Sequence, residues 1–285
     1  MLTDSNNIQI NQQVKHNLFD LRHTENHVLT IYLGYDELSF AITSVADNTV
    51  VYLKSYRLKD ADNHFAYKLL VNDLAEQEEL FKNTYHNIVI ALSSTPYTLV
   101  PHKYFELSSA EDYYNFNYKQ DNNSKIMANF VTGYNCFAIY AVDLQLADTF
   151  TRIFDNFTLQ HAISYLLPAL PPPNEGKGMY VYVQKSHADI VCLNGDKLLF
   201  CNTVSVYNPD ELLYHLLNTA KHTGISISHD PIIIWGDTTS EQPLYQLCSQ
   251  YLPKLSLGNR PAHLNYCPEL SVISAHQHFN LFCMR

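Results

Sequence analysis

The sequence predicts an α/β protein made of two βββαβ units that repeat one pattern. Three observations lead to this prediction. Short apolar runs of β-type residues come in groups of three, each group is followed by an amphipathic helix and one more strand, and a run of prolines separates the groups. With 285 residues, 46% of them hydrophobic and 16% charged, the chain can supply the cores that two such units need.

Residues 1–27 are polar and rich in Asn, Gln and His, which predicts a loosely ordered arm with one strand or helical turn around Val14–Leu21. The first unit begins at Val28. Its predicted elements are strands at Leu29–Leu33, Leu38–Val45 and Thr49–Leu58, a turn at Asp47-Asn48, a helix over about Asp62–Lys82 and a strand at His86–Leu92. The acids Glu76, Glu78 and Glu79, late in that helix, are interpreted as a solvated face.

A small β-rich insertion, at about residues 99–141, is predicted within the first half, which spans residues 28–167. Its predicted elements are a strand at Leu99–Phe105, a short helix from Ser108 to Tyr118, and paired strands at Lys125–Val131 and Cys136–Ala141. The short helix carries the aromatic residues Tyr113, Tyr114, Phe116 and Tyr118. Packing inside the insertion and exposure as a partner-binding patch are both open for this cluster. A helix over Leu144–Phe157 follows.

Residues 168–178 are predicted to be a linker, because three consecutive prolines fit neither a helix nor a central strand. The second half covers residues 179–285. Asn194-Gly195 predicts a type I′ hairpin turn between its second and third strands, and Asn208 predicts a capped helix that Gly224 ends. Its remaining elements are strands at Val181–Val183, Ile190–Leu193, Leu198–Phe200 and Ile232–Trp235, a helix over Ser240–Leu252 and a final strand in His278–Met284.

Two βββαβ halves, each starting with a three-stranded meander, resemble the ribonuclease H-like halves of the actin-like ATPase superfamily. That superfamily includes actin, Hsp70, sugar kinases and bacterial division and pilus-assembly proteins with insertions in the first half. The chain is more similar still to an uncharacterised family of Bacteroidetes-type bacteria, domain of unknown function 3822. This resemblance covers about Val28–Met284 and rests on the layout, the YLGYDELSFAI segment and the Tyr/Asn/His-rich composition. It implies a duplicated ribonuclease H-like fold with a cleft between the halves.

In working members of the superfamily, the turn after the first strand of each half carries an Asp-x-Gly signature for Mg²⁺ and phosphate. Here the first turn has Gly34 where the carboxylate should be and Asp36 where the glycine should be, and the second turn has Gln184 at the Asp position. The adenosine signature, a strand followed by two glycines, is half kept as Gly236-Asp237. The residues that the resemblance assigns to a vestigial nucleotide site are Gly34, Asp36, Ser186, Gly236 and Asp237.

The sequence favours no other reaction centre. His and Cys are common zinc ligands, but the spacing of His263, Cys267, His276 and His278 matches no compact zinc knuckle, so we expect no metal. There is no Gly-x-Ser-x-Gly elbow and no cysteine beside a base suggested by the sequence. The six cysteines, which lack Cys-x-x-Cys spacing, are interpreted as reduced hydrophobic residues.

The formal net charge of −10 argues against a nucleic-acid binder, which needs a basic face. No window approaches a membrane span and the start is not a signal peptide, so we expect a cytoplasmic protein. Two functional hypotheses follow. The first is a non-catalytic, degenerate actin-like protein that works as an interaction or scaffold component, with an unidentified protein partner and no cofactor. The second is a divergent Mg-dependent nucleotide-binding enzyme, an ATPase or small-molecule kinase, that uses Asp36 for Mg²⁺ and Gly236 near the base of ATP. A homodimer or filament former is a further option, since members of the superfamily often polymerise.

Overall fold

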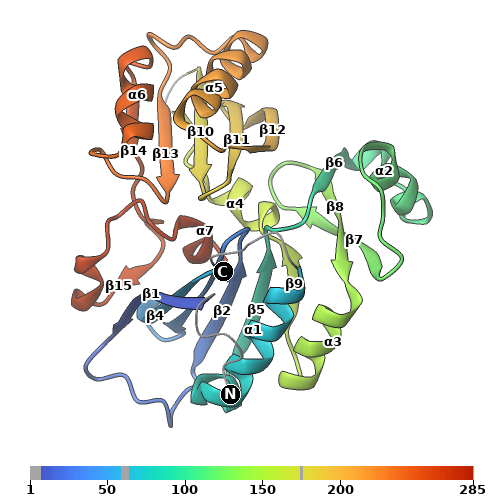
Figure 1. Cartoon of the computed structure of the whole chain (residues 1–285), viewed down its shortest axis with the longest axis vertical. Helices are drawn as coiled ribbons and strands as arrows, with labels where there is room; N and C mark the ends of the chain where they lie inside the picture. The colour runs from blue at the N-terminus through green and yellow to red at the C-terminus, as the bar shows by residue number, and fades with distance from the viewer. Residues whose placement is uncertain (1–7, 59–63, 174–175, 285) are drawn as a thin grey trace. The chain divides into compact units, whose positions relative to one another are not determined.

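The computed structural model describes residues 8–58, 64–173 and 176–284, and the chain forms two compact units (Figure 1). The first unit runs up to Tyr165 and also includes residues 262–272 and Met284 from the C-terminal part of the chain. The second unit consists of residues 166–261 and 273–283. The C-terminal stretch is therefore shared between the units, although the predicted second half includes it as one piece.

One sheet organises the first unit, with the strand order β1-β4-β3-β2-β5-β9 and with β15 added beside β4. Strands β2, β3 and β4 form an antiparallel meander, and β5 runs parallel to β2. Because β2 is central, every one of its residues after His27 is buried. The strands are β1 (Ile8–Lys15), β2 (His27–Leu33), β3 (Glu37–Ser44), β4 (Thr49–Leu58), β5 (Asn87–Leu92), β9 (Thr158–His161) and β15 (Asn265–Tyr266).

Helices α1 (His64–Gln77) and α3 (Leu144–Ile153) pack side by side against this sheet (Figure 1). Phe81, just after α1, packs against both the sheet and the end of α3. Its ring centroid lies 5.4 Å from that of Phe40 on β3 and 5.7 Å from that of Phe154, which follows α3. Leu70 and Leu74 of α1 are buried as well. The predicted βββαβ order of the first unit is confirmed.

The insertion forms its own sheet, in the order β6-β8-β7, with strands β6 (Tyr97–Pro101), β7 (Ser124–Val131) and β8 (Cys136–Asp143). Helix α2 (Ala110–Asn117) covers one face, where Val100, Tyr114 and Ile139 form a small core. The predicted aromatic cluster on α2 is divided between the two alternatives. Tyr114 is buried, whereas the side chain of Phe116 is 89% exposed.

His161, at the end of β9, joins the insertion to the main sheet of the first unit. Its ring lies 4.6 Å from that of Tyr97 and 5.3 Å from that of Tyr140, centroid to centroid. The imidazole Nε2 is 3.0 Å from the carbonyl of Thr95, and Nδ1 accepts a hydrogen bond from the backbone N–H of Ile163. Complete burial lowers the pKa of His161 to about 4, so the neutral ring is a structural part of this junction.

The second unit repeats the layout, with the strand order β12-β11-β10-β13-β14. Its strands are β10 (Lys177–Val183), β11 (His187–Asn194), β12 (Lys197–Ser205), β13 (Ile232–Gly236) and β14 (Leu255–Leu257); its helices are α5 (Pro209–Thr223) and α6 (Pro243–Tyr251). Leu212 and Leu216 of α5 pack with Ile190 and Ile234 of the sheet in the main core. β10 and β13 are parallel neighbours, as β2 and β5 are in the first unit, which confirms the predicted duplication.

The predicted start and end of α5 are confirmed. The side chain of Asn208 accepts the N–H of Glu211 at 3.0 Å, and the Glu211 carboxylate accepts the N–H of Tyr207 at 2.7 Å. Gly224 ends the helix with a φ of 68°, a left-handed conformation that glycine adopts without strain.

The predicted hairpin turn after β11 is displaced by one residue. Asn194 stays in the ladder opposite Lys197, so the two-residue loop is Gly195-Asp196, and Gly195 has the positive φ, of 57°. A glycine at the first loop position is what a type II′ turn requires. The Asn-Gly signal therefore located the hairpin correctly but assigned the wrong turn residues.

The helix predicted over Asp62–Lys82 is shorter, and residues 59–63 lie outside the described residues. α1 ends at Gln77, and a 3-10 turn covers Glu79–Lys82. Glu78 between them is extended and forms an ion pair with Lys54, while the hydroxyl of Tyr56 donates to its carboxylate at 2.6 Å. The interpretation of Glu78 as solvated is therefore wrong, because the buried Lys54 ammonium on β4 needs a partner.

The remaining differences concern short elements. The arm forms strand β1 along β4, earlier than the predicted position, and the helix predicted to Phe157 ends at Ile153 before β9. The linker is also shorter, because helix α4 (Ile163–Ala169) and β10 enter the predicted range. The final strand is instead a short helix, α7 (Phe279–Phe282). An apolar run as short as His278–Met284 suits either a strand or a helix by periodicity alone.

Candidate functional site

The turn after β2 holds the two residues predicted for the first half of the nucleotide site. The N–H of Gly34 donates to the carbonyl of Glu37 at 2.8 Å, which closes the turn. The carbonyl of Asp36 accepts the N–H of Leu58 at 2.8 Å, which ties the turn to the end of β4. Asp36 is only 4% exposed. The tight turn thus places a buried carboxylate three residues beyond the end of the central strand.

The turn after β10 in the second unit has the same backbone hydrogen bonds. The N–H of Gln184 donates to the carbonyl of His187 at 2.8 Å, and the carbonyl of Ser186 accepts the N–H of Val206 at 2.8 Å. Gln184 therefore corresponds to Gly34, and Ser186 corresponds to Asp36. The position that carries the metal carboxylate in working superfamily members is held by a glycine in one unit and by an amide in the other.

The side chains of the second turn are already engaged. The hydroxyl of Ser186 lies 2.9 Å from Nδ1 of His187, and the hydroxyl of Ser205 lies 3.5 Å from its Nε2. Gln184 is buried. This turn holds a hydrogen-bonded Ser186–His187 pair and has no carboxylate to offer to Mg²⁺.

Gly236 ends β13 and packs directly on the backbone of β10. It has a φ of 101°, and a Cβ at this position would lie 2.0 Å from the carbonyl oxygen of Val183. The same carbonyl accepts the N–H of Asp237 at 2.8 Å. The first unit repeats this contact, since Ser93 donates its N–H to the carbonyl of Leu33 at 2.8 Å. The predicted residues Ser186, Gly236 and Asp237 thus lie at the carboxyl ends of the neighbouring strands β10 and β13.

The C-terminal part of the second unit packs against the end of β13. The N–H of Gly236 donates to the carbonyl of His276 at 2.9 Å, and the His276 imidazole lies 2.5 Å from the carbonyl of Thr238. The rings of Trp235 and Phe279 are stacked with centroids 4.5 Å apart. Groups at the adenosine signature are therefore hydrogen-bonded or stacked within the chain itself. Sequence reasoning missed this, because His276 carried no signal beyond its distance from His278.

Two of the histidines considered as zinc ligands lie in the interior of the second unit. His276 and His278 are both buried, and His278 precedes α7 with a φ of 56°. Across the part of the chain that the structure describes, no three His, Cys, Asp or Glu side chains are arranged to hold a metal ion.

Asp189 on β11 is a buried carboxylate that the sequence reasoning passed over. It is 5% exposed, and the hydroxyl of Thr203 on β12 donates to it at 2.5 Å. Burial raises its pKa to about 6, although the hydrogen bond from Thr203 acts in the opposite direction. An acid in an otherwise apolar strand was the available signal. Its carboxyl can change protonation state near neutral pH.

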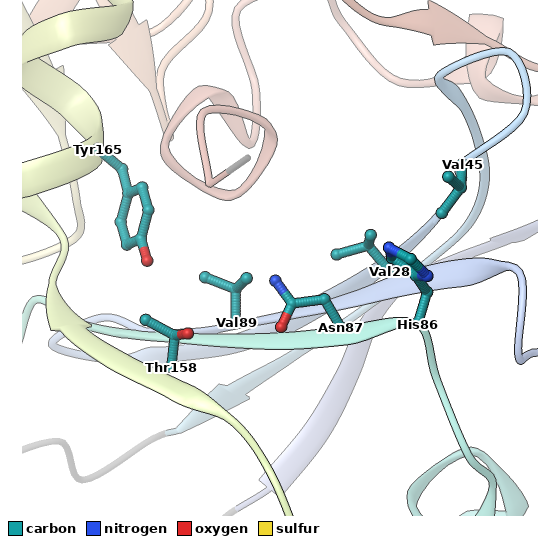
Figure 2. A pocket seen from close by; sticks show the side chains of 7 residues that line it. All are labelled: Val28, Val45, His86, Asn87, Val89, Thr158 and Tyr165. Atoms are coloured by element: carbon teal, nitrogen blue, oxygen red, sulfur yellow. The ribbon is translucent and has the colours of Figure 1, made fainter.

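A cavity of about 470 Å³ opens on the main sheet of the first unit, at the beginnings of β2, β5 and β9 (Figure 2). Its residues are Val28, Val45, His86, Asn87, Val89, Thr158 and Tyr165. The phenol of Tyr165 points into the space above Val89 and Thr158 (Figure 2), and burial raises its pKa to about 12. The volume is that of a small-molecule site. This cavity could not be predicted from the sequence, because its lining residues are far apart in the chain.

The family described as Protein of unknown function (DUF3822) matches residues 15–255. The chain is similar to a protein from Bacteroides thetaiotaomicron whose crystal structure is described as having an actin-like ATPase fold and unknown function. The two sequences are 19% identical, and the structures align with a TM-score of 0.75 over 85% of this chain and 94% of that one. The PilM-PilN type IV pilus biogenesis complex is 12% identical with a TM-score of 0.57, over 85% and 90%. No curated protein matches. These likenesses show the actin-like ATPase fold. No helix among the described residues is long and apolar enough to cross a bilayer.

Proposed function

This chain belongs to the DUF3822 family of proteins of unknown function, and we propose that it is a non-catalytic interaction component with an actin-like ATPase fold. It keeps the fold of the superfamily without depending on ATP or Mg²⁺, and it acts in the cytoplasm by binding a protein partner.

The observation that carries this proposal is the packing at the end of β13. A bound adenosine would need the backbone and the surface beside Gly236, but the N–H of Gly236 is already bonded to His276 and Trp235 is stacked on Phe279. A nucleotide would have to displace both contacts. Each lost hydrogen bond of a buried backbone group costs about 1–3 kcal/mol, which a weak ligand does not recover.

The two turns support the same conclusion. Gly34 and Gln184 stand where the Mg²⁺ carboxylates would be, and neither residue can supply a charged oxygen ligand.

The partner in the proposal is supported by two further observations. The PilM-PilN complex contains a protein of this fold together with a partner, and the insertion exposes several large hydrophobic side chains, Phe116 among them at 89%.

Isothermal titration calorimetry of the full chain with ATP and Mg²⁺ tests the proposal. We expect no saturable heat at millimolar nucleotide, and no change in melting temperature. Asp36→Asn removes the buried Asp36 carboxylate of the first turn, and Asp196→Asn, in the exposed β11–β12 turn, is the matched control. Micromolar binding that Asp36→Asn weakens and Asp196→Asn preserves would overturn the proposal.

That result would favour the second candidate, a divergent Mg-dependent nucleotide-binding enzyme. One observation speaks for it: Asp36 keeps a carboxylate in the turn after the first strand, displaced by two residues from its usual position. A carboxylate so placed would act on the water shell of Mg²⁺ rather than on the ion directly.

A further inference from the structure

The outer edge of β7 is an open end of the insertion sheet, whose order is β6-β8-β7. The hydrogen-bond pattern shows which β7 residues face outward. The N–H of Leu144 donates to Asn123 in the β8–β7 ladder, and the N–H of His102 donates to Asn135 in the β6–β8 ladder. Together these bonds assign the odd-numbered residues of β7 to the ladder with β8. The even-numbered residues therefore direct their N–H and C=O groups away from the sheet.

Ile126, Ala128 and Phe130 are the outward-facing residues in the body of the strand. Within the described residues, no hydrogen bond to another segment involves their backbone groups. The strand is eight residues long and pairs with β8 without a register shift. It contains no proline and one charge, Lys125. Proteins usually protect such edges with bulges, prolines or several charges, so a regular, open edge is suited to accepting another strand.

The two ends of this edge differ in chemistry. At one end, Phe130 is 46% exposed, and its ring lies 6.1 Å from that of His102. Tyr104 and Leu107, which follow His102 in the chain, are 62% and 75% exposed. At the other end, Lys125 is exposed and forms no ion pair with any described residue.

We propose that the β7 edge binds an extended segment of a protein partner as a fourth, antiparallel strand. The segment has apolar residues opposite Phe130 and Ala128 and an acidic residue opposite Lys125, five positions after the first apolar residue. Backbone hydrogen bonds to β7 hold the segment, and the side chains select it. This inference rests on the proposed function, for which it names the surface and the class of partner.

A second copy of this chain fits the edge less well. Two β7 strands pairing antiparallel about a two-fold axis would set the Lys125 end of one against the Phe130 end of the other. The Lys125 ammonium would then face an apolar surface instead of a carboxylate. Charge complementarity therefore favours a separate, acidic segment.

Selection of a phage-displayed library of random peptides on the full-length protein tests this proposal. We expect enrichment of peptides with the apolar-x-apolar-x-x-acid pattern. A synthetic copy of the strongest one should slow amide exchange at Ile126, Ala128 and Phe130, while Met127 and Asn129, already in the ladder, change little. Exchange that alternates along the strand is specific to added strand pairing.

Two variants complete the test. Ala128→Pro removes an outward N–H and leaves the β8 ladder intact, so it should abolish binding without unfolding the sheet. Lys125→Glu should weaken binding about five-fold, and a peptide with Lys in place of its acid should restore it. Lys119→Glu, an exposed charge change in the same insertion, is the matched control.

Three results would overturn the proposal. They are the absence of enriched peptides with this pattern, binding that both Ala128→Pro and Lys125→Glu leave unchanged, and concentration-dependent protection of the even-numbered amides without peptide. The last result would identify a second copy as the occupant. None of them bears on ATP, so the nucleotide titration still judges the proposed function separately.

Discussion

Replacing Asp189 by Asn is expected to stabilise the protein at neutral pH. The folded state raises the pKa of this carboxyl from its ordinary 3.8 to about 6 because it is buried. Between these two values the folded protein binds more protons than the unfolded chain, so stability falls as pH rises through this window. Above pH 6 the whole cost of burying the charge is present.

The shift of about two units, at about 1.4 kcal/mol per unit, sets an upper limit near 3 kcal/mol. Asn keeps an oxygen that can accept the hydrogen bond from Thr203, but it adds an amide N–H₂ that needs partners. Leaving that group unsatisfied costs about 1–2 kcal/mol. A net gain of about 1–2 kcal/mol in the free energy of unfolding is therefore expected at pH 7.5.

Urea unfolding of Asp189→Asn and of the parent protein, at pH 7.5 and at pH 4.5, measures this gain. The difference should be largest at pH 7.5 and shrink at pH 4.5, where the folded carboxyl is protonated. Asp196→Asn, an exposed carboxylate in the same unit, should show no such dependence on pH. A variant that is less stable than the parent at pH 7.5, or a difference equal at both pH values, would refute the reasoning.

Three further predictions concern stability. Lys54→Met should lower the free energy of unfolding by roughly 3 kcal/mol, because it leaves the Glu78 carboxylate without its cation. Adding Glu78→Gln should recover part of this loss in urea unfolding. Equal stabilities of the single and the double variant would contradict this. Because the folded state lowers the pKa of His161 to about 4, the stability that the neutral ring contributes is complete above about pH 6.5 and is lost as pH falls toward 4. His161→Gln should therefore flatten the dependence of the free energy of unfolding on pH over that range. An unchanged slope would exclude this role. Gly236→Ala should destabilise the protein by about 3 kcal/mol or more in thermal unfolding, since its Cβ would collide with a backbone carbonyl. Gly133→Ala, where φ is 86° but the space is open, should cost about 1 kcal/mol. Similar losses for both variants would show that the collision is relieved.

The sequence predicted the elements whose signals are local. The strands of both meanders and the α5 start at Asn208 depend on residues within one turn or one alternating run, so their patterns were readable. The partner of Lys54 was not readable, because Glu78 lies 24 residues further along the chain, after α1, and meets Lys54 only in the folded unit. The same distinction applies to the candidate site. The turn at Gly34 follows directly after a readable strand, and the resemblance to the actin-like superfamily marked it as part of the site. The contact between Gly236 and His276 joins segments 40 residues apart, and only tertiary packing brings them together.

A strand from the N-terminal part of the chain and one from its C-terminal part pair with the same strand, β4. β1 pairs with β4 from Tyr52 to Leu58, and β15 pairs with the same strand at Thr49 and Val50. On the ribosome, β1 to β5 emerge early, but β15 follows β5 by more than 170 residues. At about 5–20 residues per second, this interval lasts roughly 10–35 s. During synthesis, the edge of β4 at Thr49 and Val50 therefore lacks its β15 partner for this interval. A chain truncated before Asn265 would lack that partner permanently.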